Sequence, residues 1–283
     1  MPTDFTKFPF PGIGNPQAPS LTEAITWEPS DSGFIVVMIK TDDSDKFVGA
    51  VREFAKSLRS DAPSNGFIEV LAFRHLHREE MGGAMPFDQA ICETMLKDAD
   101  RHLEKDPDRF PALKAALKVA EGANPGADWI LLLEYKDCEQ AKIAVDAFTS
   151  KQSGFSFLTQ NSTTQSVNLF KNTNRYAHVV RDPSVIHFFN LFPGPGDPEG
   201  LWPQWQAALP WFFEVGEFRS SLPLVALDAK QQYIVVNYAH LDSVKHFFLG
   251  AFYDPTYLET IKKCYSDHGF TLPLPFFCKI VPV

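Results

Sequence analysis

The first segment with chemical potential is RHLHREE, residues 74–80, which carries two histidines one residue apart and two glutamates beyond them. Residues two apart on a strand point to the same side, so the imidazoles of His75 and His77 would face the same way. A carboxylate from Glu80 could complete a metal site of imidazole and oxygen ligands. A solvated strand end explains the same residues, and we favour a protein that holds neither a metal nor another cofactor.

The second candidate is His187, a single imidazole within the apolar run Val185–Phe192. An imidazole titrates near neutral pH, which suits the removal of a proton next to a carbonyl or the protonation of a carbanion after carbon dioxide leaves. The alternative is a core histidine whose ring is hydrogen-bonded to a backbone carbonyl. His187 is therefore a candidate catalytic base, with a structural role as the other interpretation.

Polar residues also interrupt the apolar strand predicted from Tyr233 to His240. Because side chains alternate along a strand, Tyr238 and His240 share one face, and Asn237 shares the other with Tyr233. One of these two pairs should look into an enclosed space, and the pattern does not decide which. Asn237, Tyr238 and His240 are accordingly candidate catalytic residues.

An internal repeat indicates the elements that must position these residues. Trp129–Phe148 and Tyr233–Phe252 each contain an apolar strand, a polar turn with an aspartate and a helix that ends in Ala-Phe. Each copy is preceded by a strand, an amphipathic helix and a second strand, and is followed by a final strand. This β-α-β-β-α-β order is the ferredoxin-like unit. We therefore predict an α+β chain of two tandem units that cover each other's open sheet faces around an enclosed space.

Composition and periodicity set the expected boundaries. Residues 1–32 are rich in Pro, Gly and Thr and are expected to form an N-terminal arm. The first unit is expected over 33–176, with a helical insertion at about 77–125, and the second over 183–283. In the first unit, apolar residues at i, i+4, i+7 and i+11 predict one buried helical face: Phe47, Val51, Phe54 and Leu58.

The composition is that of an ordinary globular protein: 283 residues, 45% hydrophobic, 22% charged, with a formal net charge of −9. Its Lys and Arg residues are scattered, so neither nucleic acid nor an anionic membrane is an expected partner. There is no secretory signal pattern and no run of roughly 20 apolar residues, which favours a cytoplasmic location. The dispersed cysteines are expected to be reduced: Cys92, Cys138, Cys264 and Cys278.

The second unit resembles the dimeric α+β barrel superfamily, in particular the stress-responsive barrel and EthD-like group that includes olivetolic acid cyclase-like proteins. The resemblance lies in the opening strand Val185–Phe189, the segment Tyr233–Phe252 and the helix break Asp254–Tyr257. In the cyclases the opening strand carries a histidine at its third position, which His187 matches. Their catalytic base ends a His-Pro-Ala-His helix break, where this sequence has Tyr257. A tyrosine can donate a proton or hold an enolate oxygen, so the resemblance implies that His187 is the better base.

The resemblance implies an intrachain version of the dimeric α/β barrel and a cofactor-independent enzyme. Its expected chemistry is proton transfer leading to cyclisation, decarboxylation or lyase cleavage of a small apolar, polyketide-like or aromatic substrate. Two alternatives stay open: a non-catalytic small-molecule-binding or stress protein, and a metal- or haem-dependent barrel enzyme. The chain is expected to be a monomer, because its tandem units could replace a partner chain, or a homodimer.

Overall fold

The computed structural model describes residues 28–76, 80, 127–150, 162–172, 174–175, 182–192, 221–227, 233–239 and 274–283. The elements of the first half are β2 (Gly33–Lys40), α2 (Ser44–Asn65), β3 (Phe67–His75), β4 (Trp129–Tyr135), α5 (Cys138–Thr149) and β5 (Thr163–Lys171). Those of the second half are β7 (Ile186–Phe192), β8 (Ser221–Ala226), β9 (Tyr233–Ala239) and β10 (Leu274–Val281). The short strands β1 (Glu28–Pro29) and β6 (Asn174–Arg175) pair with each other.

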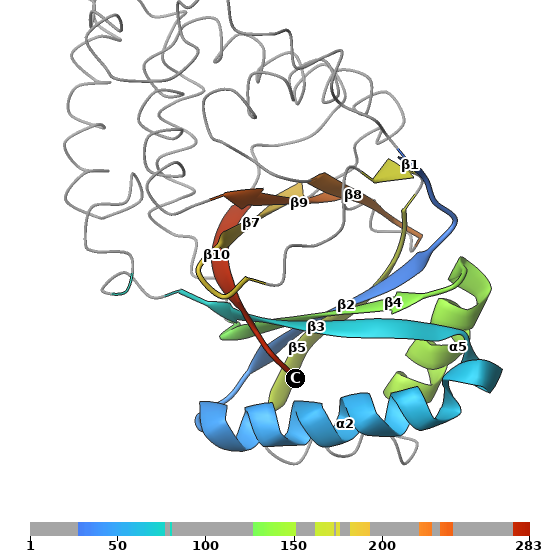
Figure 1. Ribbon diagram of the computed structural model, residues 1–283, viewed down its shortest axis with the longest axis horizontal. Helices are drawn as coiled ribbons and strands as arrows, with labels where there is room; N and C mark the ends of the chain where they lie inside the picture. The colour runs from blue at the N-terminus through green and yellow to red at the C-terminus, as the bar shows by residue number, and fades with distance from the viewer. Residues whose placement is uncertain are drawn as a thin grey trace, which may run out of the picture.

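The main strands form a closed antiparallel barrel in the order β10-β3-β4-β2-β5-β8-β9-β7 (Figure 1). Within each half the sheet order is second, third, first and fourth strand: β3-β4-β2-β5 and β8-β9-β7-β10. The halves are joined where the fourth strand of one meets the second strand of the other, at β10–β3 and β5–β8. This architecture confirms the predicted α+β class and the barrel. The helices predicted for the second half lie outside the described residues, so the full tandem repeat stays a prediction.

The first-half strands are apolar on both sides because each side has its own cover. The outer side packs against α2 and α5, which lie together beneath the sheet in Figure 1. The inner side faces the barrel, where alternate residues of the strands form one cluster. The members of this inner cluster include Phe34, Val36, Leu71, Phe73, Ile130, Leu132, Phe170, Phe189, Leu222, Leu224, Cys278 and Ile280. Burial on both sides explains why β2 and β4 are nearly continuous apolar runs.

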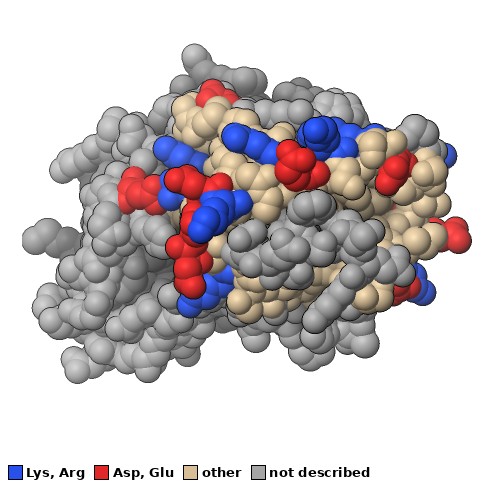
Figure 2. Space-filling model, turned by 90° about the horizontal axis from the view of Figure 1, so that it is seen from below, with Lys and Arg blue, Asp and Glu red and all other residues tan. Residues whose placement is uncertain are grey.

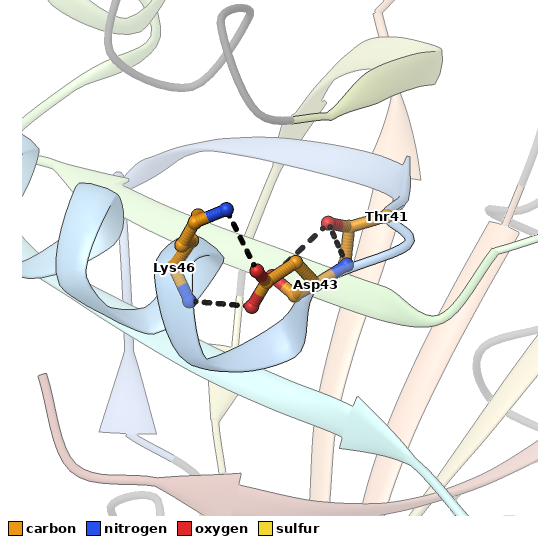
Figure 3. A network of polar contacts seen from close by, with 3 residues as sticks. All are labelled: Thr41, Asp43 and Lys46. Atoms are coloured by element: carbon orange, nitrogen blue, oxygen red, sulfur yellow. Dashed lines mark hydrogen bonds and ion pairs between the residues drawn. The ribbon is translucent and has the colours of Figure 1, made fainter.

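Helix α2 begins at a local polar network (Figure 3). The Asp43 side chain accepts a hydrogen bond from the Lys46 backbone N–H at 3.0 Å, which satisfies an otherwise unpaired N–H of the first turn. The Lys46 ammonium lies 3.1 Å from the same carboxylate, and the Thr41 hydroxyl accepts from the Asp43 N–H at 3.2 Å. These contacts lower the pKa of Asp43, chiefly through the hydrogen bond from Lys46. The predicted buried face is confirmed, with Phe47, Val51 and Phe54 fully buried.

The outer surface of this half carries charges of both signs. Figure 2 shows Lys and Arg side chains interspersed with Asp and Glu over the described residues of the face seen from below. Such a mixed surface differs from the basic stripe of a nucleic-acid-binding face. Among the described helices, none is both long and apolar enough to cross a membrane.

Candidate functional site

Four residues on four neighbouring strands lie opposite one another in the register of the barrel. Tyr238 of β9 is opposite His187 of β7. His187 is in turn opposite Cys278 of β10, which is opposite His75 of β3. Directly opposed residues of antiparallel strands share a face, with Cα atoms about 4.5–5.5 Å apart. We call Tyr238, His187, Cys278 and His75 the His–Cys row.

His187, Cys278 and His75 of the His–Cys row lie on the inner face of the barrel. His187 and Cys278 are completely buried, and Cys278 belongs to the inner cluster. His75 follows the inner-face residue Phe73 by two positions, so it points to the same side of β3. His75 is itself half-buried. His187, Cys278 and His75 therefore bring polar side chains into the mainly apolar inner cluster.

Aromatic packing orients the His187 imidazole. Its ring meets the ring of Phe73 edge-to-face, with centroids 4.9 Å apart and an interplanar angle of 62°. Phe73 also contacts Phe189 at 5.0 Å and 76°. These contacts reach across β10, which lies between β3 and β7. A histidine held in such a low-dielectric environment interacts more strongly with a substrate dipole than one in water.

The other half of the barrel carries a corresponding row with different chemistry. Glu134 of β4 is opposite Phe34 of β2, Phe34 is opposite Phe170 of β5, and Phe170 is opposite Ala226 of β8. Each row consists of one residue from each of four strands. Three of these strands are the third, first and fourth of one half, and the last is the second strand of the other half. In this second row only Glu134 can exchange a proton. Glu134 is buried and accepts a hydrogen bond from the Ser32 hydroxyl at 2.8 Å.

Burial decides the state of the thiol in the His–Cys row. Desolvation raises the pKa of Cys278 well above its usual range, and the nearby Arg74 guanidinium opposes that rise only weakly. The side chain of Cys278 is therefore a protonated thiol at neutral pH, not a thiolate nucleophile. Arg74 directly precedes His75 on β3. It forms an ion pair with Glu80, and the hydrogen bond to the Glu80 carboxylate raises the pKa of Arg74.

The register brings together some of the sequence-predicted site residues and not others. His187, Tyr238 and His75 belong to one row, although sequence reasoning had placed His75 in a separate metal hypothesis. Asn237 is opposite Phe188 and Ser221. It is therefore outside the His–Cys row, in the neighbouring row of register partners. The side chains of β9 lie outside the described residues, as do His77, His240 and Tyr257. The catalytic roles of all these residues stay predictions.

Two of the three predicted metal ligands, His75 and Glu80, are among the described residues. Glu80 is engaged with Arg74, and among the described residues no group of three or more His, Cys, Asp or Glu side chains is arranged to hold a metal ion. Because His77 lies outside the described residues, the set of His75, His77 and Glu80 stays a prediction.

Sequence reasoning missed two residues on the inner face. Cys278 gave no signal, because its proximity to His187 and His75 depends on the pairing of β10 with both β7 and β3. Glu134 did leave a signal: it is the one charged residue in the apolar strand WILLLEY. It also stands at the same place in the repeat as Tyr238, since Trp129–Phe148 and Tyr233–Phe252 align without gaps.

Comparisons with known proteins support the fold. No family model matches the chain, and no curated protein sequence is significantly similar. The chain is similar in structure to an anthrone oxidase-like protein, with a TM-score of 0.53, 11% sequence identity, and coverage of 91% of this chain and 95% of that one. A proposed monooxygenase from Fusobacterium nucleatum gives a TM-score of 0.49 at 8% identity, covering 89% of this chain and 92% of that one.

A dye-decolorizing peroxidase from Bacteroides thetaiotaomicron aligns more distantly, with a TM-score of 0.37 and 10% identity over 90% of this chain and 94% of that chain. At these identities the likeness concerns the fold alone. The resemblance expected from the sequence is confirmed at that level: this chain has the fold of the dimeric α+β barrel superfamily.

Proposed function

We propose that this chain is a barrel enzyme that removes a proton next to the carbonyl group of a small apolar, aromatic or polyketide-like substrate, with His187 as the base. The observation that carries the proposal is the position of His187, completely buried on the inner face and held edge-to-face by Phe73. A neutral imidazole has a lone pair that can accept the proton. The surrounding apolar cluster suits an apolar substrate.

Two other members of the His–Cys row, Tyr238 and Cys278, would assist His187. Tyr238 stands opposite it in the register, and a phenol there could donate a hydrogen bond to the oxygen of the enolate as charge develops. The Cys278 thiol, which keeps its proton, would act as a weak donor and not as a nucleophile. Glu134, in the corresponding row of the other half, is a second possible base.

The enolate is an intermediate common to several outcomes. In cyclisation it forms when the base removes a proton, and it then attacks a second carbonyl. In decarboxylation or lyase cleavage it forms when a carbon–carbon bond breaks, and a protonated His187 would then return a proton to the carbon. Oxidation is a further outcome, supported by the likeness to an anthrone oxidase-like protein. An anthrone methylene and one O₂ would give a quinone carbonyl and one water, with O₂ as the oxidant.

A deuterium-exchange experiment tests the base directly. Anthrone serves as the probe, and NMR in D₂O follows loss of its methylene protons while an oxygen electrode follows O₂. For wild-type protein we expect exchange above the buffer rate. His187→Phe should reduce the enzymatic rate by about 10²–10⁴-fold, the usual contribution of a general base. The control is His75→Phe, which makes the same ring change at the half-buried end of the row and should cost far less.

The contrary outcomes separate the alternatives. Exchange that survives in His187→Phe would move the base to another residue, with Glu134→Gln as the next variant. Binding of anthrone without any accelerated exchange would favour a non-catalytic binding protein. The two inner-face imidazoles, His187 and His75, are also suitable haem or metal ligands. Elemental analysis and a Soret band in the purified protein would support that alternative.

The architecture also bears on assembly. In this proposal the two halves of one chain supply the two sheets of the barrel, each with four strands in the same order. A single chain then encloses the site, and no partner chain is needed to complete it. Native mass spectrometry should give a mass of 31.8 kDa. A dimer that dissociates only with loss of folded structure would contradict this part of the proposal.

A further inference from the structure

The inner face of β5 carries two uncharged polar residues, Ser166 and Asn168. The residues that alternate with them, Val167 and Leu169, pack against the cluster on the helix side of the sheet. Because side chains alternate along a strand, Ser166 and Asn168 point into the barrel. Residues two apart on a strand are separated by about 7 Å, so these two polar side chains are neighbours on one wall.

The strands beside Ser166 and Asn168 present an apolar surface. On β2 and β4, the register partners of these two residues all belong to the inner cluster or pack against it: Met38, Val36, Ile130 and Leu132. No charged residue is among these partners. The wall therefore combines hydrogen-bonding groups on one strand with an apolar surface on the next two strands.

The described residues do not satisfy these two polar side chains. The Ser166 hydroxyl is buried and has no hydrogen-bond partner there. Asn168 is only 7% exposed, and its amide makes no hydrogen bond to any described residue. An asparagine amide offers two donor hydrogens and an acceptor oxygen, and a serine hydroxyl also donates and accepts. Buried polar groups without partners cost free energy, so two on one face of one strand call for an explanation.

The barrel wall is less tightly closed beside Ser166 than elsewhere on the inner face. Within the described part of the chain, the register pairs of β5 with β8 are confined to Phe170 and Lys171. The β5 residues Thr163–Asn168 have no β8 partner there. Met38 and Ser166 each keep part of their surface exposed, whereas the buried members of the inner cluster are at most 6% exposed. This part of the inner face therefore borders solvent.

We infer that Ser166 and Asn168 form a binding subsite for a small, uncharged molecule that has an apolar body and hydroxyl or carbonyl oxygens on one edge. The two polar side chains would hydrogen-bond to the oxygens, and Met38 and Val36 would contact the apolar body. Neither polar side chain is charged or titrates near neutral pH, so the subsite binds and orients its ligand. The inference does not rest on the proposed function, because it depends on β5 and its neighbours and not on His187.

A pair of matched ligands tests the subsite. 1,3-Dihydroxynaphthalene has an apolar body and two hydroxyl groups on one ring, and naphthalene is the same body without oxygen. Equilibrium dialysis of the full-length protein measures both affinities. We expect the dihydroxy compound to bind at least about tenfold more tightly, as two or more hydrogen bonds would give. In NMR spectra it should also shift the side-chain amide signal of Asn168, which is identified by its loss in Asn168→Leu.

Substitutions separate ligand binding from folding. Asn168→Leu and Ser166→Ala each remove a buried polar group without a partner, so we expect Tm to rise, by about 2–4 °C for Asn168→Leu. Affinity for 1,3-dihydroxynaphthalene should fall about tenfold in Asn168→Leu and about threefold in Ser166→Ala, with naphthalene binding retained. The matched control is Ser221→Ala on β8, which removes another buried hydroxyl without a partner. It should leave both affinities unchanged.

Three results would overturn the inference. Equal affinity for the two naphthalenes, or no binding of either, would mean that Ser166 and Asn168 recognise no oxygen-bearing ligand of this class. Wild-type affinity in Asn168→Leu would place the ligand elsewhere. A lower Tm in Asn168→Leu would show that the amide has a structural role. None of these measurements involves proton transfer, so binding at β5 without proton exchange at His187 would count against the proposed function alone.

Discussion

The ring of Phe73 in β3 meets the imidazole of His187 in β7 edge-to-face, with centroids 4.9 Å apart. This contact joins the two halves of the chain across β10, since β3 belongs to the first and β7 to the second. Phe73 therefore has a structural role in barrel closure and a positioning role for the candidate base.

Phe73→Leu should separate these two roles. The substitution removes aromatic contacts worth about 0.5–1.5 kcal/mol each beyond their buried area, and it leaves space beside His187. We expect the free energy of unfolding to fall by about 1–3 kcal/mol in urea denaturation, with a shift of the His187 ring signals in NMR spectra. Phe170→Leu, at a fully buried inner-face position in the other row, should be destabilised similarly but leave the His187 signals in place. Unchanged His187 signals in Phe73→Leu would contradict the positioning role.

The buried thiol of Cys278 should make stability depend on pH. Burial raises its pKa, so the native protein keeps the proton at pH values where an unfolded thiol, with an ordinary pKa near about 8.5, releases it. Unfolding therefore becomes easier as pH rises above about 8.5, by up to about 1.4 kcal/mol per pH unit. Cys278→Ala removes this contribution, and its stability should fall less steeply between about pH 8.5 and 10.

Stability between about pH 6 and 8 provides the internal control for the thiol prediction. Cys278 stays largely protonated there in both the folded and the unfolded protein, so the stabilities of wild type and Cys278→Ala should change in parallel. Burial also raises the pKa of Tyr135. That side chain adds a similar slope only above about pH 10, and it does so in both proteins. Parallel curves through about pH 9.5 would show that Cys278 does not retain its proton in the folded state.

Two glycines should respond to alanine with opposite signs. Gly66 ends α2 in the left-handed conformation, with φ 68°, and a Cβ there would lie 2.9 Å from Cγ of Gln140. Gly66→Ala should cost about 1–2 kcal/mol, because L-residues are strained at positive φ. Gly49 lies within α2, where an added Cβ would meet nothing within 4 Å, so Gly49→Ala should add about 0.5–1 kcal/mol. Chemical denaturation of both variants checks the pair, and a loss of stability in Gly49→Ala would show an unrecognised contact.

Much of the fold was encoded in local patterns. The apolar strand predicted at the start of the repeat Trp129–Phe148 is β4 in the structure, and the stripe from Phe47 to Phe54 predicted the buried face of α2. The repeat predicted the strand order of a ferredoxin-like unit because each element leaves its own periodicity in the sequence. His187 could be singled out in the same way, as a polar residue in an apolar strand.

The composition of the candidate site was decided by tertiary structure. Sequence alone left open which residues of the strand Tyr233–Ala239 face inward, because alternation defines two faces without saying which is enclosed. The register of β9 with β7 pairs Tyr238 with His187, and the double pairing of β10 brings Cys278 between His187 and His75. These three residues are distant in the chain, so their proximity results from closure of the barrel and leaves no local pattern.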